Sequence, residues 1–204
     1  MPEKTRKNKD AAGRGKVQTL GFGKARAGDI ATLRAHARSF SVEAMNTVEA
    51  DGQRVSSTAV RDALDAGDME LVTALLGRPY AIAGRVGHGE KLGRRMGFPT
   101  ANIALKHRPA LSGIFAVKVH GLPGGSRTGV ASLGVRPTVA AGGRPLLEVF
   151  VFDFDQPIYG RRVTVEFLHK LRDEARYPDL DALAAQIRTD VAQARDYFAS
   201  SSGA

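Results

Sequence analysis

The sequence predicts a mainly β protein: a small antiparallel barrel with a C-terminal helix, preceded by a short α/β segment. Three observations support this prediction. Short runs of β-forming residues recur between residues 80 and 168, Gly and Pro separate these runs, and one long amphipathic run follows them. We therefore divide the chain into a basic tail at 1–19, the α/β segment at 20–77, and the barrel with its helix at 78–200.

Six runs in the last part are expected to form strands. They span residues 80–86, 101–105, 113–120, 129–135, 146–153 and 162–168. Alternation is clear in the last run, where Val163, Val165 and Phe167 are separated by polar residues. A closed barrel would remove the exposed edges that six short strands otherwise present.

The amphipathic run that follows predicts a long helix. Its apolar residues recur with a period of 3.6 at Leu180, Leu183, Ala184, Ile187, Val191, Ala194 and Phe198. Asp179 is the expected N-cap, because a short carboxylate can accept from the free N–H groups of a first turn. Such a helix needs an apolar surface to cover, and the barrel wall is the expected one.

The α/β segment contains signals for three short helices. Their expected starts are Asp29, the hydroxyl-rich Ser56-Ser57-Thr58 and Asp68, and their expected stops include Gly67 and Gly77. The third helix has the apolar stripe Leu71, Val72, Leu75 and Leu76. Phe40, Val42 and Val48 are candidate strand positions.

Composition narrows the classes of function. The chain has no cysteine, which excludes disulfides, zinc–thiolate sites and cysteine nucleophiles. No apolar run is long enough to span a bilayer, so we expect no membrane partner and a cytoplasmic location. The net charge is +9, but residues 1–16 contain six Lys or Arg against Glu3 and Asp10, a net +4. This charge therefore favours a solvated tail over a nucleic-acid site.

A glycine-rich run at 84–102 is the first candidate for chemistry. Five of its glycines lie among four cations, so backbone N–H groups and positive side chains could both approach an anion. The run ends in Pro99-Thr100-Ala101-Asn102. Because residues two apart on a strand point the same way, Thr100 and Asn102 could hold a hard cation and a phosphate together.

Glu148 is the second candidate. Strand alternation places it on the same face as Phe150 and Phe152, where a carboxylate is costly unless it is paired or used. From this pattern alone, an ion pair or a position at the rim is as compatible as a general base for a hydroxyl nucleophile. The histidines show no ligand spacing, so none is assigned a metal.

Together these segments resemble the riboflavin kinase family. The resemblance covers about residues 78–198. It rests on the glycine-rich run with its Pro-Thr-Ala-Asn ending, on residues 132–138, 147–155 and 171–174, on Tyr159-Gly160 and on the C-terminal helix. It implies a six-stranded Greek-key barrel that makes FMN from riboflavin and ATP.

The resemblance also implies roles for individual residues. Thr100 and Asn102 would hold Mg²⁺ and the ATP phosphates, and Gly89 and Arg94 would contact the nucleotide. Glu148 would be the catalytic base toward the ribityl 5′-hydroxyl, and Arg172 would lie on the flavin side. The substrates would be the small molecules riboflavin and ATP, with no nucleic acid; a monomer is the working expectation.

Residues 21–29 and 55–61 resemble the last part of the FMN adenylyltransferase module that precedes the kinase in bacterial bifunctional FAD synthetases. The paired-histidine motif His-x-Gly-His occurs nowhere in the chain. We therefore expect adenylyltransfer to be lost, and treat residues 20–77 as a remnant.

Two alternatives stay open. One is a bifunctional family member with lost or residual adenylyltransferase activity, whose remnant spoils folding unless its apolar stripe packs on the barrel. The other is a basic small barrel that binds nucleic acid. Against the second, aromatic and basic residues are not interleaved as base stacking requires.

Overall fold

The computed structural model describes residues 21, 25, 27–43, 48–50, 52–89, 92–135 and 145–201. It forms two compact units, Met1–Val48 and Glu49–Ala204, which are treated separately. The predicted tail at 1–19 and residues 136–138 of the family segment lie outside the described residues.

In the first unit, helix α1 (Ile30–His36) begins where the sequence predicts. The carboxylate of Asp29 caps it and accepts from the Thr32 backbone N–H at 2.8 Å. The strand expected around Phe40, Val42 and Val48 is wrong. Phe40 and Val48 are 56% and 63% exposed, and the described residues of this unit contain no strand with which they could pair.

The second unit begins with a two-stranded ribbon, β1 (Glu49–Ala50) and β2 (Gln53–Arg54), and two short helices. Helix α2 (Ser57–Ala66) is capped by the Ser56 hydroxyl, and helix α3 (Met69–Leu76) by the Asp68 carboxylate. Gly67 separates them at a φ of 76°, a left-handed conformation that glycine adopts without strain. The predicted capping signals of this segment are confirmed.

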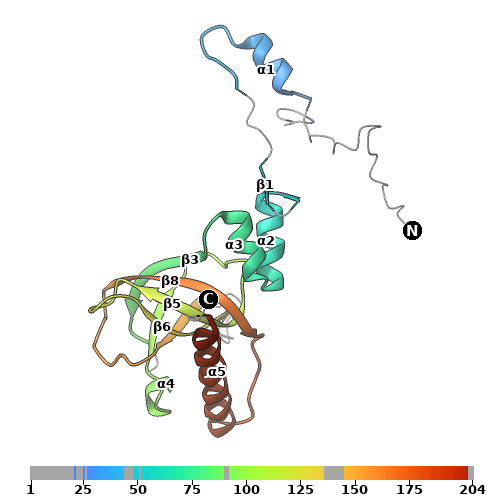
Figure 1. The fold of residues 1–204 in the computed structure, drawn as a ribbon. Helices are drawn as coiled ribbons and strands as arrows, with labels where there is room; N and C mark the ends of the chain where they lie inside the picture. The colour runs from blue at the N-terminus through green and yellow to red at the C-terminus, as the bar shows by residue number, and fades with distance from the viewer. Residues whose placement is uncertain are drawn as a thin grey trace. The chain divides into compact units, whose positions relative to one another are not determined.

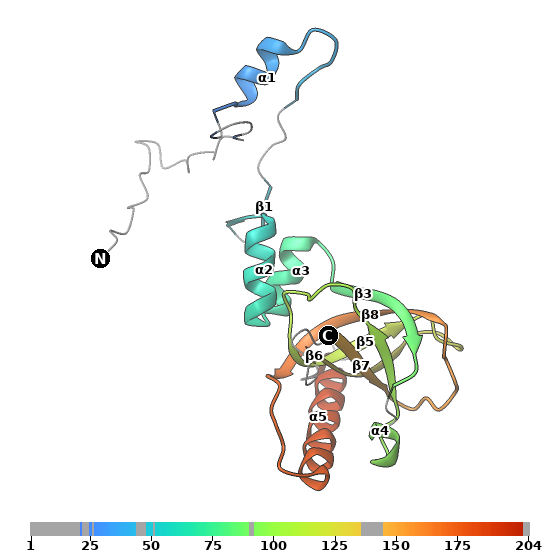
Figure 2. The ribbon, with the colours of Figure 1, turned by 180° about the vertical axis from the view of Figure 1, so that it is seen from behind.

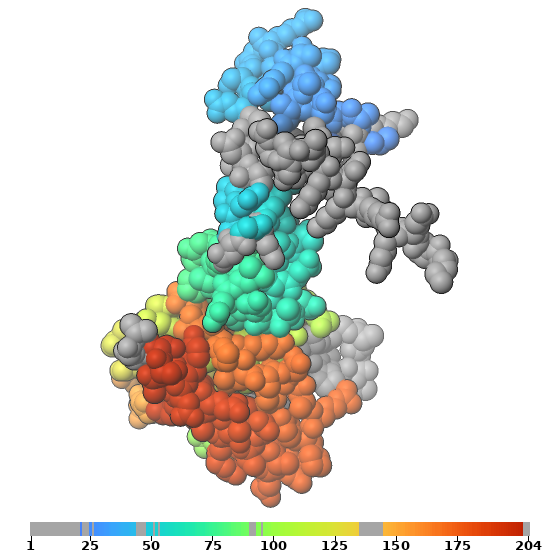
Figure 3. All heavy atoms as spheres, turned by 45° about the vertical axis from the view of Figure 1, so that its right-hand side comes forward, coloured from blue at the N-terminus to red at the C-terminus, as the bar shows by residue number. Residues whose placement is uncertain are grey.

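Helices α2 and α3 pack on the barrel. Val72 and Leu75 are buried in the same hydrophobic core as the barrel residues, and α3 contacts β3 and β8. Figures 1 and 3 show the two helices seated against the barrel. The apolar stripe is therefore covered, which removes the reason to expect that this segment spoils folding. That it is a remnant of a separate domain, with a boundary between residues 77 and 78, stays a prediction.

This packing predicts that α3 and the barrel unfold together. Leu75→Ala should lower the free energy of unfolding by about 2–5 kcal/mol, because it leaves a cavity in the shared core. Urea unfolding followed by circular dichroism would measure this. Leu180→Ala is the matched control, since Leu180 is 47% exposed and should lose little. If the barrel of Leu75→Ala unfolded at the same urea concentration as that of the unmodified chain, α3 and the barrel would not share one core.

The barrel has six antiparallel strands and is closed. They are β3 (Tyr80–Gly87), β4 (Thr100–Ala104), β5 (Gly113–His120), β6 (Arg127–Val135), β7 (Pro145–Val151) and β8 (Arg162–Arg172). Their order is β3-β4-β7-β6-β5-β8. Since β5, β6 and β7 are joined consecutively and β4 lies beside β7, the connection is a Greek key. The six predicted strands and the predicted barrel are confirmed, although β8 runs four residues further than predicted.

Alternation along the strands separates two faces. Val163, Val165 and Phe167 point into the barrel and are almost fully buried, and the Phe167 ring meets Phe115 edge-on at 5.4 Å. The opposite face of β5, β6 and β7 contributes Ile114, Val130 and other residues to a second cluster. The outer wall is therefore apolar where the C-terminal helix reaches it.

Helix α5 (Leu180–Ser201) covers this outer wall, as predicted (Figures 1 and 2). Asp179 accepts from the Ala182 backbone N–H at 2.7 Å and so caps its first turn. Ala194 is fully buried against the outer cluster. None of the helices in the described part of the chain combines the length and the hydrophobicity that a membrane span requires.

Candidate active site

Register places the candidate residues side by side on the outer face of the barrel. Asn102 on β4 is directly opposite Glu148 on β7, and Glu148 is opposite Ser132 on β6. Thr100 is opposite Phe150. Directly opposed residues of neighbouring strands project from the same face, so β4, β7 and β6 align these side chains.

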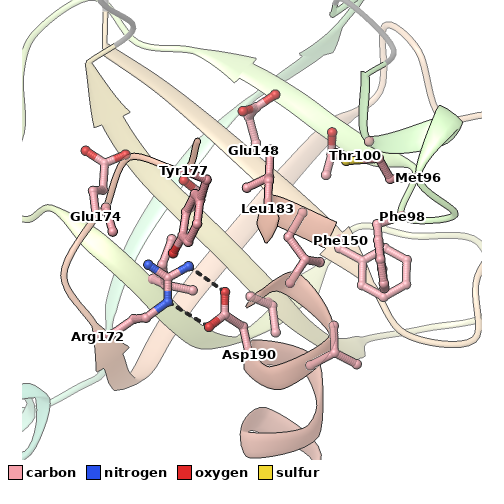
Figure 4. Close-up of a pocket in the computed structure, with 17 residues that line it drawn as sticks. Met96, Phe98, Thr100, Glu148, Phe150, Arg172, Glu174, Tyr177, Leu183 and Asp190 are labelled. Carbon is pink, nitrogen blue, oxygen red and sulfur yellow. Dashed lines mark hydrogen bonds and ion pairs between the residues drawn. The ribbon is translucent and has the colours of Figure 1, made fainter. Parts of the chain in front are cut away.

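A pocket of about 490 Å³ lies between this face and helix α5. Figure 4 shows Glu148, Thr100 and Arg172 around it, contributed by three different strands. Its polar lining comprises Thr100, Ser132, Glu148, Arg172, Glu174, Tyr177 and Asp190. Its apolar lining includes Met96, Phe98, Ile114, Val130, Phe150, Leu183, Ile187 and Val191. This volume and mainly apolar lining suit one flat organic molecule.

A second pocket of about 280 Å³ lies on the other side of Thr100. Arg94, from the short helix α4 (Leu92–Arg95), lines it together with Tyr159 of the β7–β8 loop. The Tyr159 ring also stacks on His88 at 4.1 Å, which joins this loop to the glycine-rich segment. Thr100 is common to both pockets, so a molecule in one would meet a molecule in the other beside it.

Gly89 and Asn102 are in close contact. A Cβ atom at Gly89 would overlap the Asn102 carboxamide, so glycine is what allows the loop to close over this side chain. Asn102 is 7% exposed, and its Nδ2 donates to the Thr100 carbonyl at 3.1 Å. Its Oδ1 accepts no hydrogen bond from the described residues.

The Asn102 Oδ1 atom is a suitable ligand for the expected Mg²⁺. A buried acceptor without a partner is costly, and Mg²⁺ prefers oxygen ligands. The Thr100 hydroxyl belongs to the same strand face two residues away. These residues therefore fit a divalent cation, while the described residues contain no group of three or more carboxylates and histidines that could hold a metal by themselves.

Sequence reasoning missed Asp190, which is 2% exposed on helix α5. Its carboxylate accepts two hydrogen bonds of 2.7 Å from the Arg172 guanidinium. The signal was present, because Asp190 lies three residues after Ile187 and four before Ala194, on the apolar stripe. A carboxylate at such a position needs a cationic partner, but the sequence could not name it.

Two pKa shifts reflect this environment. The hydrogen bonds to Asp190 raise the pKa of Arg172, so its guanidinium keeps its charge. Burial raises the pKa of Glu174, and the neighbouring Glu148 carboxylate raises it further, whereas Arg108 and Arg172 act in the opposite direction. Of the three carboxylates that line the pocket, Glu148 and Glu174 are thus near enough to repel each other.

Comparison with known families decides what kind of protein has this site. The profile of the Flavokinase family, described as riboflavin kinase, matches residues 76–198, more than half of the chain. The chain belongs to the riboflavin kinase family. The resemblance stated for about residues 78–198 is confirmed, and both pockets are lined entirely by residues of the matched region.

Curated relatives are bifunctional riboflavin kinase/FMN adenylyltransferases. That of Pseudomonas fluorescens is 53% identical over 178 residues, which are 85% of this chain and 57% of the relative. That of Haemophilus influenzae is 49% identical over 181 residues, 87% of this chain and 58% of the relative. The chain therefore spans little more than half the length of these relatives. Because the matches cover so much of the chain, they extend well ahead of residue 76.

A solved structure with the same fold is the crystal structure described as a macrolide-efflux protein from Streptococcus pneumoniae. It is 32% identical, with a TM-score of 0.67, and covers 84% of this chain and 56% of its own. The structural similarity covers 84% of this chain, which is more than the region matched by the family profile. It therefore extends beyond the barrel and its helix.

Proposed function

We propose that this chain transfers the γ-phosphoryl group of ATP to the ribityl 5′-hydroxyl of riboflavin and releases FMN and ADP. The observation that carries the proposal is the position of Thr100, in a chain of the riboflavin kinase family, between an apolar pocket and a second pocket lined by Arg94. Two substrates bound in these pockets would meet beside Glu148.

The larger pocket suits riboflavin. The isoalloxazine ring is flat and largely apolar, which matches walls that include Phe98 and Phe150, whose rings meet edge-on at 5.4 Å. Its oxygen-bearing edge requires donors, which Arg172 and Ser132 can supply. The ribityl chain would extend from the ring toward Glu148 and Thr100.

The nucleotide would bind from the Arg94 side. Arg94 would neutralise phosphate charge, and Gly89 would let the backbone approach closely. Thr100 and Asn102 would hold Mg²⁺, which supplies neutralisation of the charge that develops on the phosphate oxygens. This part of the proposal is supported by the free Asn102 Oδ1 among the described residues and by the contact between Gly89 and Asn102.

Glu148 would act as the general base. Its carboxylate would accept the proton of the 5′-hydroxyl as that oxygen bonds to the γ-phosphorus and the bond to the bridging oxygen of ADP breaks. The protein would contribute mainly by holding the hydroxyl and the phosphate in line.

The proposal extends to partners and to the second activity. We expect riboflavin and ATP as the only partners, no nucleic acid, a monomer, and a cytoplasmic location where ATP is available. We also propose that this chain does not adenylylate FMN, because its sequence has no His-x-Gly-His motif. Bifunctional activity, as the names of the relatives suggest, is the competing possibility.

One assay tests both parts. The purified chain is incubated with riboflavin, ATP and Mg²⁺, and the flavins are separated by chromatography. We expect FMN to form, to stop when EDTA removes the metal, and no FAD to follow. FAD formation from FMN and ATP would contradict the proposal that adenylyltransferase activity is lost. A folded chain that neither binds riboflavin nor forms FMN would overturn the kinase.

A further inference from the structure

Asp190 and Arg172 form a deeply buried ion pair. Its Asp190 side chain is 3% exposed and its Arg172 side chain 22%. The Asp190 Oδ1 accepts from Arg172 Nε and Oδ2 accepts from Nη2, both at 2.7 Å, while Gln186 adds a donor to Oδ1 at 3.0 Å. This two-point contact fixes both the position and the plane of the guanidinium.

The same contacts leave part of the guanidinium for a ligand. Arginine has five N–H donors. Two are used by Asp190, and Nη1 uses a third on the Asp173 carbonyl at 2.9 Å. One donor on each of Nη1 and Nη2 then has no partner among the described residues. Figure 4 shows the guanidinium at the pocket, beside Tyr177.

The position of Arg172 indicates which part of a substrate it meets. Arg172 is opposite Ile114, Ile114 is opposite Ser132, and Ser132 is opposite Glu148. Three strand-to-strand steps of about 4.8 Å therefore separate the backbones of Arg172 and Glu148, roughly 14 Å in all. Because its backbone is three strands from that of Glu148, Arg172 is placed to bind the ring rather than to take part in phosphoryl transfer.

A second ion pair joins α5 to the barrel and gives a comparison. Arg195 contacts Asp153 at 3.0 Å, but these side chains are 51% and 76% exposed, and neither lines either of the two pockets described above. The pair of Arg195 and Asp153 thus anchors helix α5 outside the pocket, whereas the pair of Arg172 and Asp190 anchors the helix and also lines the pocket.

We propose that Asp190 is a positioning residue for the flavin: it holds the Arg172 guanidinium so that its two remaining N–H donors face the oxygen-bearing edge of the isoalloxazine ring. This inference rests on the proposed function, because it takes riboflavin as the ligand. Asp190 also cancels the charge of Arg172, so the wall can accept a neutral ring without leaving a buried unpaired cation.

Asp190→Asn tests the proposal, because the amide keeps the size of the side chain but cannot pair with both guanidinium donors. The dissociation constant of riboflavin, from quenching of its fluorescence, and its KM should both rise at least about tenfold, as for one lost charge-assisted hydrogen bond. The kcat and the KM for ATP should stay within about threefold. Asp153→Asn, which breaks the anchoring pair alone, should leave all four within about threefold.

Combination with Arg172→Gln separates positioning from support of the fold. If Asp190 acts through Arg172, Asp190→Asn should add less than about twofold to the riboflavin dissociation constant in that background. A full additional effect would overturn the proposal, and so would a loss spread equally over kcat and both KM values. If Asp190→Asn does not fold, Asp190→Glu keeps the charge but displaces the guanidinium; an unchanged riboflavin affinity in it would overturn the proposal.

These measurements also separate failure of the inference from failure of the proposed function. Absence of FMN formation in the unmodified chain would contradict the kinase. The riboflavin dissociation constants of Asp190→Asn and Asp153→Asn would still decide whether Asp190 positions Arg172. Equal constants in the two variants would contradict the positioning role even if the unmodified chain makes FMN.

Discussion

Glu148→Gln should lower kcat by about two to four orders of magnitude, because general base catalysis typically contributes that much. Glutamine has nearly the same size and can still hydrogen-bond the hydroxyl, but it cannot accept its proton. Riboflavin affinity should therefore change little, since the apolar walls and Arg172 stay in place. Steady-state FMN formation and riboflavin fluorescence quenching measure the two quantities separately.

Glu166→Gln is the matched control. Glu166 also lies on a barrel strand, but its carboxylate pairs with His120 at 3.0 Å and lines neither pocket. Its kcat should stay within a few-fold of the unmodified chain. Full activity in Glu148→Gln would be consistent with a riboflavin kinase but would contradict the role of Glu148 as general base. In that case the reaction would depend on positioning and charge neutralisation alone.

Gly89→Ala is expected to have the second largest effect. The added Cβ would overlap the Asn102 carboxamide, so either the loop or the proposed Mg²⁺ ligand must move. A displacement near 1 Å can cost about a hundredfold in rate. We expect a raised KM for ATP and a lower kcat, with the riboflavin dissociation constant unchanged. Initial rates at varied ATP and Mg²⁺ would measure both.

Gly87→Ala provides the comparison for this substitution. Gly87 is the last residue of β3, and a Cβ there would come no nearer than 3.8 Å to the Asn102 carbonyl oxygen, an ordinary contact. Its kinetics should therefore stay within about threefold of the unmodified chain. Equal losses in the two variants would indicate a general effect of reduced loop flexibility. Equal retention of activity would show that Asn102 tolerates displacement.

Local patterns were sufficient for much of the fold. The caps at Asp29, Ser56, Asp68 and Asp179 follow from short-range hydrogen bonds, which the neighbouring residues alone determine. Alternation at Val163 and Phe167 correctly separated the inner face of the barrel from the outer one. The same logic failed at Phe40 and Val48, because a strand needs a partner, and residues nearby in the sequence do not reveal whether one is present.

The sequence also did not predict that β8 extends as far as Arg172. Its pairing with β5 changes register between Ile114 and Phe115 and between Ala116 and Val117, so simple alternation breaks down before the strand ends. This extension gives Arg172 its place in the pocket wall. The resemblance had assigned it to the flavin side, but no local pattern could have done so.

Most helices and strands, their apolar faces and the residue types suited to chemistry follow from the sequence alone. Thr100 and Asn102 were predicted there as oxygen ligands, and Glu148 as a carboxylate among aromatic side chains. The folded chain was needed to show that Thr100 lies between two pockets, that Gly89 closes over Asn102, and that Asp190 pairs with Arg172. Caps and periodicity depend on residues within a few positions of one another. These contacts depend instead on strand pairing, on closure of the barrel or on docking of α5, which act over longer separations in the chain.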